Sequence, residues 1–208
     1  MQKITFNFLD QHRHGSAFHE YLRLRKTFFV DVLHWDIPHN DEVEMDQYDN
    51  PCAYYSLVLR NGRVVAGARV MSTKAVWGQH SYMLRDAYRG QIASIPSDIL
   101  ESDLVSDDVW ECTRLVTSDC VVGRMERGRA LSMVVEGLIG IATLNGGSQL
   151  VTLTRPCLMR ALRLLGFDVS QVGDAYVSDA DGCRYAMLRM PATAENDAIP
   201  DTPELMAA

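Results

Sequence analysis

Hydrophobic and polar positions follow two different patterns in the first part of this chain. Apolar residues recur every three or four positions between 16 and 33, starting with Phe18, and Ser16 stands where it can cap a helix. Residues 35–50 instead carry six acids, no lysine or arginine, and Pro38, which is typical of a loop. The pattern therefore predicts a helix over 16–33 followed by an acidic loop.

Strand patterns dominate the middle of the chain. Two apolar runs, 54–60 and 63–71, are separated by Asn61-Gly62, a pair that strongly indicates a type I′ hairpin turn. The remaining segments predict strands over 109–117, 150–154, 167–172 and 185–190, and helices over 126–144 and 156–165. This order implies a single α/β domain in which helices flank one mixed sheet.

The composition fits one folded domain. The chain has 208 residues, of which 47% are apolar and 23% charged, and this is enough to bury a sizeable core. We expect the domain to cover residues 1–190. Residues 191–208 contain three prolines, four acids and no basic residue, which predicts a flexible acidic tail.

Charge and local composition argue against several classes of protein. The net charge of −7 disfavours a general nucleic-acid binder. Residues 1–8 lack the basic and apolar segments of a secretory signal, and the longest apolar run, 134–142, is too short to span a membrane. The five cysteines form no Cys-x-x-Cys pair, so we expect a reduced cytoplasmic protein with no metal, no nucleic-acid partner and no membrane association.

One group of charged and aromatic residues could bind a cationic, partly apolar ligand. It spans the end of the predicted helix and the acidic loop, and it consists of Arg25, Phe29, Trp35, Glu44, Asp46 and Asp49. Aromatic faces attract cations, carboxylates bind ammonium groups, and an arginine can hold a ligand carboxylate through two hydrogen bonds. The alternative from composition alone is a buried aromatic pair beside a solvated acidic loop.

A second group lies within one predicted strand. Strand alternation places Glu111 and Thr113 on one face, and Cys112 and Arg114 on the other. A charged residue in a central strand is costly unless it is paired. Glu111 therefore belongs either to a reactive site or to an inter-strand ion pair, for instance with Arg69.

A third group is basic. Residues 122–163 hold six arginines and two glutamates, although the whole chain is acidic. The candidate basic patch consists of Arg124, Arg127, Arg129, Arg160 and Arg163. The first three surround a predicted helix start, where backbone N–H groups can bind anions. The alternative is a solvated basic face.

The order and spacing of these residues resemble the acyl-homoserine-lactone synthase family, the LuxI-type autoinducer synthases. The resemblance rests on Arg25, Phe29, Trp35, the segment 44–49, Arg69, Met83-Leu84 and Glu111-x-x-Arg114. It covers about residues 20 to 170. The chain departs from the family pattern at residues 70–73, which lack the usual aliphatic-Pro-Thr ending, and at Cys112-Thr113, where a small serine is usual.

The resemblance implies a fold like that of GNAT-type acyltransferases and an enzyme that makes N-acyl-L-homoserine lactone signals for quorum sensing. The family uses S-adenosylmethionine, a consumed substrate rather than a cofactor, and an acyl chain carried on acyl carrier protein or coenzyme A. The substrate amine attacks the acyl thioester, and the substrate carboxylate then closes the lactone and expels methylthioadenosine. The donor type, the acyl chain and the oligomeric state stay open.

The resemblance also implies roles for individual residues. Glu44 and Asp46 would bind or deprotonate the amine, with Glu111 as the competing base. Arg69 and Arg114 would orient carboxylates. The residues that would bind S-adenosylmethionine are Arg25 at its carboxylate, Phe29 and Trp35 at adenine and sulfonium, and Asp49.

The acyl donor would meet two further features. Thr152 is expected in the acyl-chain pocket, where a hydroxyl can favour chains oxygenated at the third carbon, and an ordinary strand threonine is the alternative. The candidate basic patch would attract an acidic acyl carrier protein through electrostatic steering.

Two other functions fit the same residues. An N-acyltransferase of the same fold could acylate another amine, such as a free amino acid, without forming a lactone. A non-catalytic sensor could bind S-adenosylmethionine or an acyl carrier. Release of methylthioadenosine separates the synthase from the first alternative, and turnover of an acyl donor separates it from the second.

Overall fold

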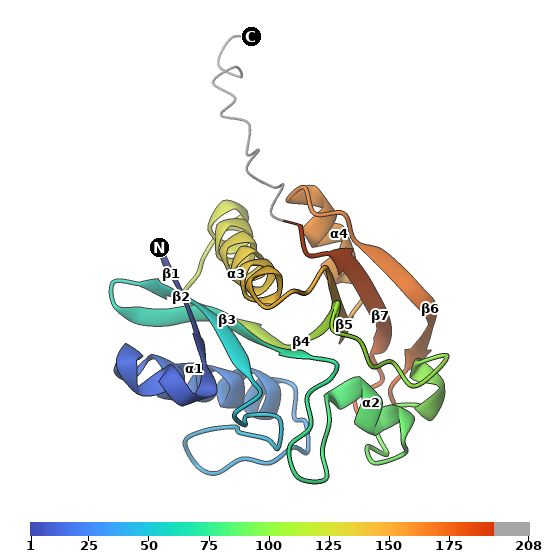
Figure 1. Ribbon diagram of the computed structural model, residues 1–208. Helices are drawn as coiled ribbons and strands as arrows, with labels where there is room; N and C mark the ends of the chain where they lie inside the picture. Colours follow the sequence, from blue (N-terminus) through green and yellow to red (C-terminus); the bar gives the residue numbers. More distant parts are fainter. Residues whose placement is uncertain (194–208) are drawn as a thin grey trace.

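One seven-stranded sheet organises the molecule, with helices on both of its faces (Figure 1). The computed structural model describes residues 1–193. The strands lie in the order β1-β2-β3-β4-β5-β7-β6, and all neighbouring pairs are antiparallel except β4 and β5. The prediction of one α/β domain with a mixed sheet flanked by helices is confirmed.

The elements have the following bounds. The strands are β1 (Gln2–Asn7), β2 (Tyr54–Arg60), β3 (Arg63–Ser72), β4 (Val109–Thr117), β5 (Gln149–Thr154), β6 (Ser170–Val177) and β7 (Arg184–Pro191). The α-helices are α1 (Ala17–Arg25), α2 (Met83–Tyr88), α3 (Arg124–Leu144) and α4 (Cys157–Leu164). Shorter helical segments are η1 (Phe8–His14), η2 (Lys26–Val32) and η3 (Ser97–Ile99).

The two faces of the sheet bury separate hydrophobic cores. α3 and α4 cover one face, where Leu138 and Leu162 belong to the buried cluster. α1 and the segment around α2 cover the other face, where Tyr21, Tyr55 and Leu84 are fully buried. The apolar surface removed from water on both faces holds the sheet between its helices.

The hairpin and the central strand match the sequence expectation. Asn61 and Gly62 both adopt positive φ angles, 52° and 76°, as a type I′ turn requires. β4 occupies Val109–Thr117, as its apolar pattern predicts. β1 and α2 were not predicted, because each has six residues and shows too short a stretch of periodic pattern.

β6 overlaps the strand predicted over 167–172 only at residues 170–172, so the strand is confirmed but its predicted start is wrong. Phe167 and Val169 are buried, with exposures of 3% and 1%, but they pack in the segment that leads from α4 to β6. β6 itself is an edge strand without a buried residue. The apolar residues at 167 and 169 therefore mark core packing rather than strand pairing.

The helix predicted over 16–33 changes character at Arg25. α1 ends there, and the π-helical η2 (Lys26–Val32) continues it. The Ser16 hydroxyl donates a 2.8 Å hydrogen bond to the Glu20 carboxylate and does not cap the backbone. The helical region is confirmed, whereas the predicted cap is wrong.

The sheet opens between β4 and β5. These strands pair only through residues 109–111 and 149–151 and then diverge, and we call the space between the diverging parts the wedge. β4 also shifts register against β3 between Gly67 and Arg69, close to Arg114, whose φ is 56°. A positive φ in a non-glycine residue breaks the strict alternation of side chains along a strand.

The fold extends past the expected domain end at residue 190. β7 runs through Pro191, and the backbone N–H of Ala192 donates to the carbonyl of Ser148. The rest of the predicted acidic tail, residues 194–208, lies outside the described residues. Within residues 1–193, no helix has the length and apolar character needed to cross a membrane.

α3 packs tightly against the sheet at Gly137, which gives a stability prediction. A Cβ at Gly137 would clash with the Ser56 side chain, whose hydroxyl donates to the Val134 carbonyl at 2.9 Å. We expect Gly137→Ala to lower the free energy of unfolding by about 1–3 kcal/mol through overpacking. Gly140→Ala is the matched control, because nothing lies within 4 Å of its added Cβ.

Urea unfolding followed by circular dichroism measures both variants. Gly140→Ala should leave stability unchanged or raise it by up to about 1 kcal/mol through helix propensity. Equal effects of the two substitutions would show that α3 does not pack on Ser56 in this way.

Candidate active site

Three arginines and three carboxylates from separate segments meet on the α1 face of the sheet. The arginines come from α1, β3 and β4, and the carboxylates come from the loop that follows η2. The set, called the ion-pair cluster, consists of Arg25, Arg69, Arg114, Glu44, Asp46 and Asp49. The cluster therefore joins the charged residues of the first group to Arg114 of the second.

Arg25 ties the acidic loop to the end of α1. Its Nε lies 2.6 Å from Glu44 Oε2, and its two terminal nitrogens donate to the Asp49 oxygens at 2.8 Å each. Tyr55 donates to the same Asp49 carboxylate. Because the Arg25 side chain has no exposure, its guanidinium faces the loop carboxylates and not an open surface.

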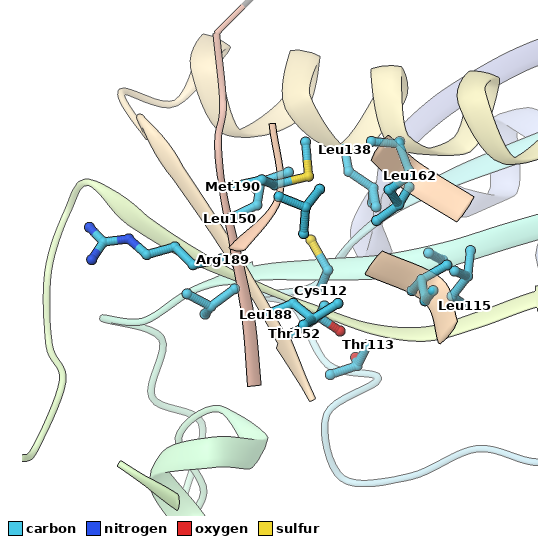
Figure 2. Close-up of a pocket in the computed structure, with 15 residues that line it drawn as sticks. Cys112, Thr113, Leu115, Leu138, Leu150, Thr152, Leu162, Leu188, Arg189 and Met190 are labelled. Carbon is cyan, nitrogen blue, oxygen red and sulfur yellow. The ribbon is translucent and has the colours of Figure 1, made fainter. Parts of the chain in front are cut away.

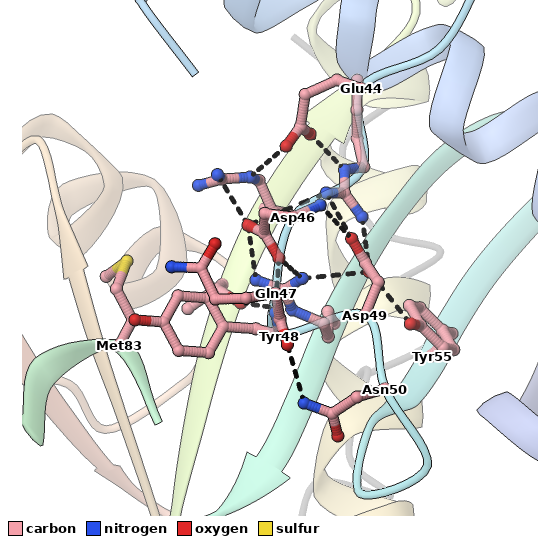
Figure 3. A network of polar contacts seen from close by, with 12 residues as sticks. Glu44, Asp46, Gln47, Tyr48, Asp49, Asn50, Tyr55 and Met83 are labelled. Carbon is pink, nitrogen blue, oxygen red and sulfur yellow. Dashed lines mark hydrogen bonds and ion pairs between the residues drawn. The ribbon is translucent and has the colours of Figure 1, made fainter. Parts of the chain in front are cut away.

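Arg69 and Arg114 hold the loop from the sheet side. Arg69 Nη1 pairs with Asp46 and lies 3.0 Å from Asp49 Oδ1. Arg114 Nη2 lies 2.7 Å from Asp46 Oδ2, and its Nε lies 3.3 Å from Glu44 Oε1. Figure 3 shows Glu44, Asp46 and Asp49 converging on the same group of guanidinium nitrogens.

The cluster balances three positive and three negative charges away from water. Burial alone would raise the pKa of Asp46, but the charges of Arg69, Arg114 and Arg25 outweigh it and hold this pKa well below its usual range. The pKa of Asp49 is lowered too, because Arg69 and Arg25 outweigh the cost of its burial. Both aspartates are therefore ionised at neutral pH, and the cluster is a fixed array of charges.

Arg114 reaches the cluster because β4 bends. Strict alternation would put Arg114 on the face opposite Thr113, yet Thr113 bonds to Arg69 while Arg114 bonds to Glu44 and Asp46. The prediction of opposite faces is wrong, and the positive φ of Arg114 is the reason. At 10% side-chain exposure, Arg114 is the cluster member closest to solvent.

Glu111 stands apart from the cluster and has neutral partners. Its carboxylate accepts hydrogen bonds from the backbone N–H groups of Met83 and Leu84, at 2.9 and 2.8 Å, where α2 begins. Burial raises its pKa, and the N–H groups and the positive charge of Arg69 offset only part of this rise, so that the pKa lies at about 7. The ion-pair alternative with Arg69 is wrong, since Arg69 pairs with Asp46 and Asp49 instead.

The two aromatic residues of the first group lie beside the cluster. Phe29 and Trp35 stack with ring centroids 5.0 Å apart and planes 26° apart. The Arg114 guanidinium lies over the Phe29 ring, 5.4 Å from its centroid. The structure thus joins a buried Phe29 and a half-buried Trp35 to the charged group, and the three carboxylates of the cluster are buried rather than solvated.

The wedge between β4 and β5 holds an apolar pocket (Figure 2). The pocket lining is mostly apolar and includes Cys112, Leu138, Leu150 and Thr152. Thr113 lines the pocket too, and its hydroxyl accepts a 3.0 Å hydrogen bond from Arg69 Nε. The apolar pocket and the charged cluster therefore meet at Thr113.

The arginines of the candidate basic patch lie on two neighbouring helices and are exposed. They are Arg124, Arg127 and Arg129 at the start of α3, and Arg160 and Arg163 on α4. A Cβ at Gly128 would lie 3.3 Å from Leu165, so the start of α3 adjoins the end of α4. The patch therefore combines charges from both helices on the face opposite α1.

Several polar residues around the site had no signal in the sequence. Asp86 is fully buried and accepts hydrogen bonds from the Tyr48 hydroxyl and the backbone N–H of Ser81. Asp181 accepts the indole N–H of Trp35 from 146 positions away. The partners of both residues are set by tertiary packing, which local pattern does not show.

Comparisons with known proteins agree with this geometry. The family model described as autoinducer synthase matches residues 10–198. An acyl-homoserine-lactone synthase of Aeromonas salmonicida is 25% identical over 183 residues, which cover 87% of this chain and 83% of that protein.

Two solved structures share the fold. The structure of TofI in a ternary complex with an inhibitor and MTA matches with a TM-score of 0.70 and 23% identity, covering 93% of each chain. The structure of BjaI, a CoA-dependent acyl-homoserine lactone synthase with SAM and isopentyl-CoA, matches with a TM-score of 0.71 and 17% identity, covering 91% of this chain and 82% of the other. The chain is therefore an enzyme that belongs to the autoinducer synthase family.

Proposed function

We propose that the protein joins S-adenosylmethionine to an acyl group carried on acyl carrier protein or coenzyme A, and releases an N-acyl-L-homoserine lactone and methylthioadenosine. The observation that carries this proposal is the junction at Thr113, where the apolar wedge meets the ion-pair cluster. An acyl chain suits the wedge, and a substrate with both ammonium and carboxylate groups suits the charged side. S-adenosylmethionine is consumed, so no cofactor is proposed, and the reaction would take place in the cytoplasm.

The acyl-transfer step requires a base, because an ammonium group is not a nucleophile. Glu111 suits this role, since burial raises its pKa to about 7 and a base works best when its pKa lies near the working pH. The low pKa of Asp46 makes that carboxylate a weak base. We assign Glu111 as the base that takes the proton of the substrate ammonium, directly or through a water molecule, with Glu44 as the competing base.

The lactone-forming step requires positioning rather than a strong base. The substrate carboxylate is already a nucleophile and the sulfonium is a good leaving group, so a folded substrate conformation is what the protein must supply. Arg114 is suited to hold the carboxylate, because it lies at the edge of the cluster. Arg25 and Arg69 would position Glu44, Asp46 and Asp49, while Phe29 and Trp35 cover the sulfonium and adenine.

The acyl chain would lie in the wedge, against β5 and α3. Thr152 lines this pocket, which supports its proposed preference for chains oxygenated at the third carbon. The thioester of the acyl donor would sit near Thr113, within reach of the S-adenosylmethionine amine. An acyl carrier protein, which is acidic, would dock on the exposed arginines at the start of α3 and on α4.

The Glu44 carboxylate gives the first test of this proposal. Glu44→Gln keeps the size of the side chain but removes the charge between Arg25 and Arg114, so we expect lactone formation to fall about 100-fold or more. The measurement is mass spectrometry of lactone and methylthioadenosine after incubation with S-adenosylmethionine and acyl donor. Circular dichroism checks the fold.

Glu42→Gln is the matched control, because Glu42 is exposed in the same loop. It should keep normal turnover. A Glu44→Gln protein with near-normal turnover would remove Glu44 as an essential group. Acyl transfer by the wild-type protein without methylthioadenosine would instead indicate an N-acyltransferase that acts on another amine.

The raised pKa of Glu111 predicts the pH dependence of the reaction. A base must be deprotonated to act, so kcat/KM should rise with pH through about 7 and level off above it. Glu111→Gln should lower turnover about 100-fold and remove this rise of kcat/KM near pH 7. Any rise of kcat/KM with pH that remains in the variant belongs to the substrate amine. A pH profile of kcat/KM identical to that of the wild type would exclude Glu111 as the base.

The basic patch predicts how the enzyme responds to charge. Reversing Arg127 and Arg163 to Glu should raise KM for a carrier-borne donor roughly fivefold, and added salt should weaken the wild-type interaction in the same way. Arg184→Glu is the control, because Arg184 is exposed on β7, away from α3 and α4. If neither the charge reversal nor added salt changes KM for the carrier-borne donor, the patch is a solvated face.

A further inference from the structure

The turn between β6 and β7 holds Trp35 in place. Asp181 Oδ2 accepts a 3.1 Å hydrogen bond from the Trp35 indole N–H and a 2.6 Å bond from the Tyr185 hydroxyl. Asp181 Oδ1 accepts the backbone N–H of Cys183 at 2.9 Å, which fixes the carboxylate within its own turn. The aspartate is thus oriented by its neighbours before it meets the indole.

This hydrogen bond crosses between the two halves of the sheet. Trp35 follows η2 in the N-terminal half, whereas Asp181 belongs to the C-terminal half, and β4 and β5 pair only through residues 109–111 and 149–151. β7 begins beside Thr154, at the end where β4 and β5 diverge. The Trp35–Asp181 bond therefore lies at the open end of the wedge.

A row of contacts leads from Asp181 to the ion-pair cluster. The Trp35 ring stacks on Phe29, and the Arg114 guanidinium lies over Phe29. Arg114 in turn pairs with Asp46. A change in the orientation of the indole would reach the edge of the cluster through two contacts.

We propose that Asp181 is a positioning residue for S-adenosylmethionine, which acts through Trp35 by fixing the plane of the indole from the opposite half of the sheet. This inference rests on the proposed function, because it takes Phe29 and Trp35 as the surface that covers adenine and sulfonium. An aromatic face binds a cation only when its plane faces the charge, and a fixed side chain loses less entropy on binding.

The charge of the Asp181 carboxylate strengthens its hydrogen bond with the Trp35 indole. Burial alone would raise the pKa of Asp181, but the hydrogen bonds from Tyr185, the Cys183 backbone and Trp35 outweigh it and lower the pKa. The carboxylate is therefore ionised when it accepts the indole N–H. A hydrogen bond to an ionised group is stronger than one between neutral groups.

Alanine substitution at Asp181 tests the inference. Asp181→Ala should raise KM for S-adenosylmethionine by up to about tenfold, because an indole that is no longer fixed must lose its rotamer freedom on binding, and it should change kcat less than about threefold. KM for the acyl donor should stay unchanged. Asp181→Asn keeps an acceptor oxygen, so it should restore part of the affinity. Asp179→Ala, in the same turn and exposed, is the matched control.

A second variant separates positioning from a general loss of structure. Trp35→Phe keeps an aromatic face but has no N–H donor, so it should raise the same KM, and Asp181→Ala should add little in that background. The inference is overturned if Asp181→Ala matches Asp179→Ala, or if its effects add fully to those of Trp35→Phe. An equal loss of affinity for the acyl donor would also overturn it.

Equilibrium dialysis with S-adenosylmethionine keeps this test distinct from the test of the proposed function. If the wild-type protein forms no lactone, the proposed function fails, yet the ratio of dissociation constants between wild type and Asp181→Ala still decides the role of Asp181. A ratio near ten supports positioning, and a ratio near one contradicts it.

Discussion

Charge buried under the sheet is the constraint on which the rest of this structure depends. The ion-pair cluster draws its arginines from α1, β3 and β4 and its carboxylates from one loop without regular structure. A buried charge is tolerated only when it is paired, and removing one partner typically costs about 3–5 kcal/mol. The loop therefore has its shape because Arg25, Arg69 and Arg114 fix Glu44, Asp46 and Asp49 from three directions.

Two other features bring chemistry to this fixed array. β4 and β5 diverge, so an apolar pocket opens next to the cluster, and Thr113 belongs to both. Glu111 lies in the same strand as Thr113, and burial raises its pKa to about 7 even though two backbone N–H groups donate to it. The pKa of Asp46 stays low because arginines surround that carboxylate. The protein thus separates charges that position a substrate from a carboxyl that can exchange a proton.

Local pattern was enough to predict the hairpin at Asn61-Gly62 and the bounds of β4, because turn chemistry and strand alternation are short-range signals. The site residues were expected together because of their spacing and the family resemblance, since no periodic pattern brings α1, β3 and a loop to one place. The orientation of Arg114 depends on a strand bulge, and the partner of Trp35 lies 146 positions away. Such features follow from tertiary packing and leave no local trace.

The measurement that tests this account most directly counts two products of one reaction. Purified protein is incubated with S-adenosylmethionine and an acyl donor, and methylthioadenosine and acyl-homoserine lactone are quantified together over time. One site that performs acyl transfer and ring closure predicts equal amounts of the two products at every time point. Acylated product without methylthioadenosine, or no turnover with acyl carrier protein and coenzyme A donors of several chain lengths, would contradict the account.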